Sequence, residues 1–138
     1  MASRWKQRYD NFVRALALLE LYVEKETLTE LERPGLMQTF EIVCELAWNT
    51  IKDFYEDQGS GTLGMQGGKD AVRLAFQRGL ISDAKPWFRL IEDRNRTSHT
   101  YHEELAKRVA ERIRSEYIVL FRELAETLKP AFDREDET

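Results

Sequence analysis

The sequence predicts an all-α protein, an antiparallel up-and-down four-helix bundle with one additional short helix. Apolar residues recur at alternating intervals of three and four along most of the 138-residue chain, which is the spacing of one helix face. Glycine and proline residues interrupt these stripes at a few places, so the helices should be joined by short connections. No segment shows the two-residue alternation of a β-strand.

The first two helices should form the main seam of this bundle. A stripe predicts the first helix from about Arg4 to Glu26 and consists of Trp5, Tyr9, Phe12, Leu16, Leu19 and Val23. Pro34 interrupts the pattern, and a second helix is expected from about Leu36 to Asp57. Its stripe consists of Met37, Phe40, Cys44, Ala47, Ile51 and Phe54. Further apolar residues widen this stripe, so the second helix should be central or lie at a subunit contact; they are Ile42, Val43, Leu46 and Trp48.

The middle of the chain is rich in glycine. Five glycines between Gly59 and Gly68 predict a flexible loop, followed by a short helix from Lys69 to Arg78. Gly79 should end that helix in a Schellman motif. Residues 59–64 spell the dinucleotide-binding pattern GxGxxG, but a helix precedes them where that chemistry needs a strand, so we do not predict a nucleotide site.

Two longer helices complete the bundle. One should begin at Ser82 or Asp83, with Pro86 tolerated in its first turn. The last should run from about Tyr101 to Leu128 and stop before Pro130. Its inner stripe consists of Leu105, Val109, Ile113, Tyr117, Leu120 and Leu124. Residues 131–138 are expected to form an acidic flexible tail, and residues 1–138 a single domain.

Composition narrows the functional classes. The net charge of -4 argues against a surface coated in basic residues for duplex DNA, although residues 94–114 carry six basic residues against three acids. Cys44 is the single cysteine and should be a small core residue, which fits a reducing compartment. We find no membrane span and no signal peptide before the first amphipathic stripe, so we expect a cytoplasmic protein.

Polar chemistry is concentrated in residues 94–102. Arg94 follows Leu90 and Ile91 at helical spacing, which places it on the apolar face of the fourth helix. Thr100 and Glu103 have the form of a capping box at the start of the last helix. The helix break should therefore fall between about Arg96 and Thr100, with His99 in it.

Two interpretations of Arg94 and His99 follow from the residues. In the first, Arg94 pairs with a carboxylate such as Glu92 or an acid of another helix, and His99 caps or packs. In the second, a guanidinium and an imidazole share one cleft and act on a phosphate, which suffices for metal-independent RNA cleavage through the ribose 2′-hydroxyl. His102 and Glu103 add no complete metal-ligand set, so we expect no metal and no cofactor.

The segment Arg94-Asn95-Arg96-Thr97-Ser98-His99-Thr100-Tyr101 resembles the R-xxxx-H-x-Y signature of HEPN-domain proteins. Within them it is similar to the HepT-like toxins and the nucleotidyltransferase substrate-binding subunits, over the whole chain. The resemblance implies a homodimeric ribonuclease toxin in which Arg94 holds the phosphate, His99 is the acid or base and Asn95 orients them. It also implies a partner nucleotidyltransferase antitoxin that places AMP on Tyr101.

Alternatives remain at this stage. The chain could be a non-catalytic substrate-binding subunit of a two-component nucleotidyltransferase, in which case it would bind its partner and cut no RNA. A purely structural dimeric helical module would tolerate loss of both Arg94 and His99. Tyr101 could instead be an ordinary half-buried aromatic residue.

Overall fold

The computed structural model describes residues 3–59, 61, 65–99 and 102–134. The regular structure within this part of the chain is entirely helical. Its elements are α1 (Arg4–Glu24), α2 (Glu32–Asp57), α3 (Gly67–Gln77), α4 (Lys85–His99), α5 (Glu103–Arg112), the π-helical turn η1 (Ile113–Tyr117) and α6 (Ile118–Asp133). No helix in the described ranges has both the length and the apolar composition that a membrane crossing requires.

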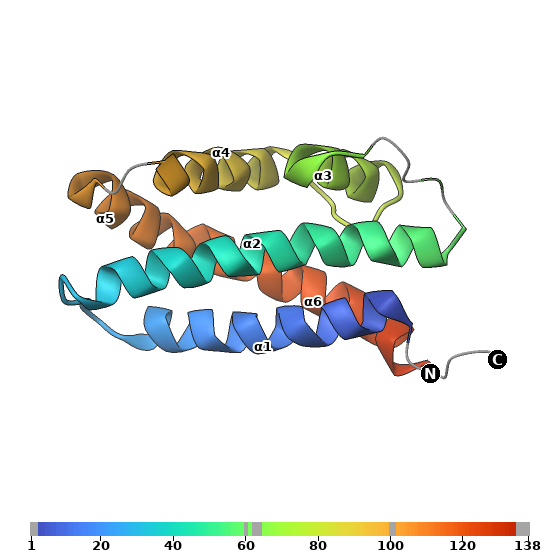
Figure 1. Cartoon of the computed structure of the whole chain (residues 1–138), viewed down its shortest axis with the longest axis horizontal. Coiled ribbons are helices and arrows are strands. Elements are labelled where there is room, and N and C mark those ends of the chain that lie inside the picture. The colour runs from blue at the N-terminus through green and yellow to red at the C-terminus, as the bar shows by residue number, and fades with distance from the viewer. Residues whose placement is uncertain (1–2, 60, 62–64, 100–101, 135–138) are drawn as a thin grey trace.

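Helix α2 lies in the middle of the bundle. Figure 1 shows α1 along one side of α2, α3 and α4 along the opposite side, and the C-terminal helix crossing obliquely behind it. Helix α5, η1 and α6 follow one another without a break, so they act as one long helix. The bundle is thus the predicted all-α architecture, with α3 as its short addition.

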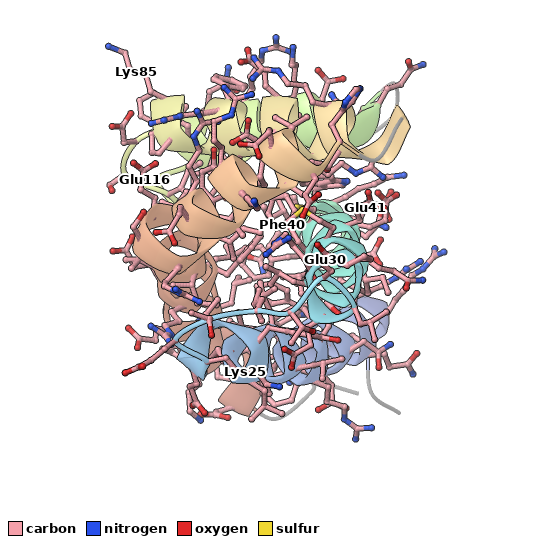
Figure 2. All side chains as sticks on the ribbon, turned by 90° about the vertical axis from the view of Figure 1, so that its left-hand side faces the viewer. Lys25, Glu30, Phe40, Glu41, Lys85 and Glu116 are labelled. Atoms are coloured by element: carbon pink, nitrogen blue, oxygen red, sulfur yellow. The ribbon has the colours of Figure 1, made fainter. Side chains whose placement is uncertain are left out.

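Aromatic side chains fill the space between these helices. Phe40 of α2 lies near the centre of the bundle in the end-on view (Figure 2) and stacks on Tyr117, with ring centroids 5.9 Å apart. Phe121 contacts both Phe12 and Trp87 edge-on. Most of the predicted stripe residues are buried, although Val23, Phe54, Leu105 and Leu120 are only half-buried. Cys44 is a buried core residue as expected.

Helix α2 begins four residues earlier than the sequence predicted. Thr29 and Glu32 form a capping box, in which the Glu32 amide donates to the Thr29 hydroxyl at 3.1 Å and the Thr29 amide donates to the Glu32 carboxylate at 3.0 Å. Pro34 does not interrupt the helix, because amides in the first turn have no partner within the helix. The expected break at Pro34 was therefore wrong.

Helix α3 ends as the sequence predicted and begins two residues earlier. Gly79 has a φ of 79°, and the Leu80 amide donates to the Ala75 carbonyl at 2.8 Å, as in a Schellman motif. At its other end the helix includes Gly67 and Gly68, because Gly68 lies directly on the ring of Trp48. A Cβ atom at Gly68 would come within 2.9 Å of that ring.

The C-terminal helix departs from the prediction in two ways. The predicted inner stripe advances by four residues at each step from Leu105 to Tyr117, which would drift off the face of a helix with 3.6 residues per turn. The π-helical turn at Ile113–Tyr117 accommodates these steps and leads into a buried stripe that includes Ile118 and Phe121. Pro130 lies inside α6, which continues to Asp133 and so includes the start of the predicted tail. Phe132 contacts Tyr9 at a centroid distance of 4.6 Å, and this packing offsets the amide that proline lacks.

Candidate functional site at the end of α4

Helix α4 carries the motif and is anchored by its first half. The Lys85 amide donates to the Asp83 carboxylate at 3.1 Å, which caps the helix start, and Pro86 occupies its first turn as expected. Leu90 and Ile91 are buried against the core. The second half of α4, which bears the motif, is therefore attached to a firmly packed helix.

The helix continues through His99, so the predicted break between Arg96 and Thr100 with His99 inside it was placed too early. Hydrogen bonds from the Thr97 hydroxyl to the Asp93 and Arg94 carbonyls accompany this last part of the helix. The side chain of His99 lies outside the described part of the structure. Tyr101 and Thr100 lie outside it entirely.

Helix α5 begins at Glu103, with His102 rather than Thr100 as the residue before its first turn. Thr100, the other residue of the predicted capping box, lies outside the described residues, so that capping box stays a prediction. The Glu103 carboxylate pairs with Arg33 of α2 at 3.2 Å. This long-range ion pair joins the starts of α2 and α5, and His102 is exposed beside it.

The sequence placed Arg94 on the apolar face of α4, and the structure shows it half-buried at the border of that face. Its side chain is 28% exposed, and its Nη2 atom lies 3.4 Å from a carboxylate oxygen of Glu45 on α2. Its Nε atom is buried and has no hydrogen-bond partner among the described residues. An acid from another helix does pair with Arg94, as the first interpretation required, but the pair leaves donors of the guanidinium unused.

Asn95 is next to Arg94 and oriented toward it. The Asn95 side-chain oxygen lies 3.5 Å from Nη1 of Arg94, at the limit of a hydrogen bond. His99 follows Asn95 by four residues, which is about one turn of the same helix. Asn95 therefore lies between the other two motif residues along α4, and its orienting role stays a prediction.

A pocket of about 290 Å³ opens beside Arg94 and Asn95. It lies between α2, α4 and the beginning of α3, and is lined by Glu45, Trp48, Gln66, Gly67, Gly68, Lys69, Ile91, Arg94 and Asn95. Two basic residues and one acid surround it, and the first amides of α3 have no side-chain cap. An anionic group of the size of a phosphate fits the charge and volume of this pocket.

The sequence analysis missed Asp93, which is the most buried charged residue of α4. Asp93 is 1% exposed. Both of its carboxylate oxygens accept from Arg112 at 2.9 Å, and one accepts from the Tyr117 hydroxyl at 2.5 Å. Burial, followed by the hydrogen bond to Asp93, raises the pKa of Tyr117 well above its ordinary value. The signal in the sequence was the helical spacing of Asp93 from Leu90, together with a tyrosine on the opposing stripe.

Metal chemistry has no support from the described residues. No group of three or more His, Cys, Asp or Glu side chains in that part of the chain is arranged to hold an ion. Burial raises the pKa of the Cys44 thiol well above its ordinary value, so Cys44 stays protonated beneath Arg94. Among the described residues that line the pocket, Arg94, Lys69 and Asn95 carry side-chain donors that an anion could accept from.

The chain is similar to known proteins in family, sequence and structure. The model of the family described as "Nucleotidyltransferase substrate binding protein like" matches residues 7–130. A Haemophilus influenzae protein named "Probable ribonuclease HepT" is 39% identical over 77 residues, which are 54% of this chain and 53% of the relative. The match thus spans about half the length of that curated relative.

Two solved structures share the fold. One, from Haemophilus influenzae, is described as revealing the fold of a substrate-binding domain of a nucleotidyltransferase; it has a TM-score of 0.74 at 28% identity, over 88% of this chain and 98% of that one. The other, from Thermus thermophilus, has a TM-score of 0.71 at 26% identity, over 89% of this chain and 99% of that one. The similarity includes nearly all of each solved chain, so it applies to the bundle as a whole.

Proposed function

Because this chain belongs to the family of nucleotidyltransferase substrate-binding-like proteins, we propose that it is a HepT-like toxin of a toxin-antitoxin module. In this proposal it is a homodimeric endoribonuclease that needs no metal ion. A cognate nucleotidyltransferase silences it by modifying Tyr101. The relative named as a probable ribonuclease HepT supports this choice within the family.

The observation that carries the proposal is the state of Arg94. Arg112 donates from Nη1 to both carboxylate oxygens of the buried Asp93 at 2.9 Å. Arg94 makes a long ion pair with the half-exposed carboxylate of Glu45 and a long hydrogen bond to Asn95, and it lines a pocket. A phosphate oxygen can displace the contact with Glu45, because an exposed ion pair contributes little free energy.

The reaction follows from the residue types. The 2′-oxygen of the RNA attacks the adjacent phosphorus, the bond from phosphorus to the 5′-oxygen breaks, and the products carry a 2′,3′-cyclic phosphate and a 5′-hydroxyl. His99 takes the 2′-hydroxyl proton as a base or delivers a proton to the leaving 5′-oxygen as an acid. Arg94 stabilises the charge that develops on the phosphate oxygens, and Asn95 orients Arg94.

Two protomers would supply both an acid and a base to one cleft. Ile42 supports this arrangement, because it lies on α2 one turn before Glu45 and is 48% exposed. An exposed apolar residue next to the pocket of Arg94 is suited to a contact between copies. A two-fold axis near Ile42 would place the motif of each protomer on the side that faces its partner.

Silencing would use Tyr101, which follows His99 by two residues. The Tyr101 hydroxyl oxygen attacks the α-phosphorus of ATP on the partner enzyme, and pyrophosphate leaves. The attached AMP adds negative charge beside the cleft and repels the RNA backbone. After co-expression with the partner, intact-mass analysis should show one AMP on Tyr101 and none on Tyr101→Phe; an inhibited complex with unmodified tyrosine would exclude this mechanism.

The nuclease proposal is tested by incubating total RNA and transfer RNA with purified protein in chelator at several pH values. Wild-type protein should produce fragments with 2′,3′-cyclic phosphate ends, and His99→Ala should reduce the rate by about 10² or more, the usual scale for a general acid or base. Tyr9→Phe is a control away from the motif. Cleavage that persists in His99→Ala would remove this residue from the chemistry.

The second candidate is a non-catalytic substrate-binding subunit of a nucleotidyltransferase. The ion pair between Arg94 and Glu45 favours it, because a paired guanidinium is less available to RNA. This candidate expects a stable complex with the partner enzyme and no RNA cleavage by an unmodified, folded dimer. The same cleavage assay therefore separates the two candidates.

A further inference from the structure

The pocket beside Arg94 does not end at the motif. A second cavity of about 110 Å³ adjoins it and is lined by Glu45, Trp48, Asn49, Lys52, Met65 and Gly67. Because Glu45, Trp48 and Gly67 line both cavities, the two form one groove along α2. We call this groove, from Arg94 past Lys69 to Lys52, the α2–α3 groove.

The charges along this groove are unbalanced. Lys52 and Lys69 form no ion pair with any residue in the described part of the chain, whereas most other basic side chains there have a carboxylate within 4 Å, as Arg89 has Glu116. Glu45 is the acid that lines both cavities, and it faces Arg94. The α2–α3 groove therefore has spare positive charge in addition to the guanidinium of the motif.

The nearby acid of α3 does not neutralise Lys69. Asp70 accepts from the Gln66 amide at 2.9 Å and from Arg73 at 2.9 Å, so its carboxylate is already in use. The amides of the first turn of α3 add positive potential on the same side. Lys69 thus remains available to an anion from outside the protein.

Packing of the preceding residue holds the backbone at Lys69. Gly68 is buried against Trp48, where a Cβ atom would clash with the ring at 2.9 Å, so the start of α3 rests directly on α2. Lys69 follows Gly68 and is exposed at the rim of the groove. A firmly seated backbone lowers the entropic cost of holding this lysine near a ligand.

We propose that the α2–α3 groove binds single-stranded RNA, with Lys69 and Lys52 contacting the phosphates next to the one held by Arg94. This inference rests on the proposed nuclease function and extends its site. Single-stranded RNA carries one charge per nucleotide, so a line of unpaired cations leading away from the cleavage site matches its backbone. The two cavities have volumes of about 290 and 110 Å³, which suit the groups of one strand better than the broad surface of a duplex.

The test uses binding, so that it does not depend on turnover. His99→Ala protein is titrated onto a fluorescent ten-nucleotide RNA over a range of salt concentrations, with and without the pair Lys52→Gln and Lys69→Gln. The pair should weaken binding at least 10-fold at low salt. It should also reduce the slope of log Kd against log salt by about 1.4, because each phosphate contact on a single strand contributes about 0.7.

Two controls make the result specific. Lys85→Gln should leave the affinity and the salt slope unchanged, since Lys85 projects from α4 into solvent (Figure 2) and lines neither cavity. The pair Lys52→Arg and Lys69→Arg keeps the charges and should retain at least most of the binding. Circular dichroism of each variant confirms that the bundle is folded.

Each outcome decides between explanations. Unchanged affinity and slope in the Gln pair, together with RNA cleavage by the wild type, overturn the groove and leave the nuclease proposal standing. Absence of both RNA binding and cleavage by the wild type overturns the groove and the nuclease proposal together. Equal affinity for single-stranded and duplex RNA in the same titration overturns the assignment to a single strand.

Discussion

Asp93 and Arg94 are adjacent on α4, and the fold surrounds their charges in opposite ways. Asp93 is 1% exposed, and its carboxylate accepts hydrogen bonds from Nη1 of Arg112 at both oxygens and from the Tyr117 hydroxyl at one. Arg94 is 28% exposed, and its contacts are long, 3.4 Å to Glu45 and 3.5 Å to Asn95. Its buried Nε atom has no partner among the described residues. One charge is saturated, and its neighbour keeps unused donors.

This difference is what we would expect between a structural charge and the ligand-binding charge proposed for Arg94. A buried carboxylate must be satisfied fully, because an unpaired charge in a low dielectric costs several kcal/mol. A guanidinium at a pocket can remain partly unsatisfied, since water reaches it until a ligand arrives. The π-helical turn contributes to the first arrangement, because Tyr117 lies in it and Arg112 immediately precedes it.

The largest effect on stability should come from removing the saturated charge. Asp93→Ala leaves Arg112 and the Tyr117 hydroxyl without their partner, so we expect a loss of about 3–5 kcal/mol in the free energy of unfolding. Urea denaturation followed by circular dichroism measures it. Glu92→Ala, a neighbouring exposed acid, is the matched control; equal midpoints for the two variants would contradict a structural role for Asp93.

The opposite pattern is expected for Arg94. Arg94→Ala should change the free energy of unfolding by no more than about 1 kcal/mol, because its ion pair is partly exposed. RNA cleavage should fall about 10²–10³-fold, the range for loss of a donor to the transition state. Rates are compared with those of Arg89→Ala, whose pair with Glu116 lies on the same helix. A loss of stability as large as that of Asp93→Ala would place Arg94 among the structural residues.

Glu32 is an intermediate case and should give the smallest effect. It is hydrogen-bonded to Lys25 and to the Thr29 amide, which lower its pKa to about 2 from an ordinary value of 4.5, yet it lies at the surface. Because the folded pKa is below the unfolded one, the stabilisation is complete above about pH 4.5 and is lost as the pH falls toward 2. In thermal melts, the Tm of the wild type should therefore be higher than that of Glu32→Gln at pH 7. This difference in Tm should shrink as the pH falls through this window. A difference independent of pH would exclude the carboxylate charge as its cause.

Much of the fold was accessible from local patterns. The stripes that begin at Trp5 and Met37 predicted α1 and most of α2, because a helix face repeats every 3.6 residues or so whatever lies opposite. Gly79 predicted the end of α3 for a similar reason, since a left-handed residue is chosen locally. Element ends that depend on distant contacts were predicted less well: Pro130 lies inside α6, where Phe132 packs on Tyr9.

The candidate site shows the same division. The sequence identified Arg94 and Asn95, and the structure places both at the pocket. The sequence did not indicate that Arg94 lies at the border of the apolar face, and the burial and pairing of Asp93 were missed. Helical spacing predicts which face of a helix a residue lies on, but not which residue lies opposite. The roles of His99 and Tyr101 remain predictions for the experiments above.

The sequence by itself determined the helical class, the order of the helices and the residue types of the motif, because periodicity and residue type are local properties. Only the tertiary structure decided which charges are satisfied. Arg112 lies 19 residues from Asp93 and Glu45 lies 49 residues from Arg94 along the chain. Lys52, Lys69 and Arg94 likewise come together because Gly68 lets α3 rest on Trp48. The free energy of a charge depends on what surrounds it in space, and packing sets those surroundings.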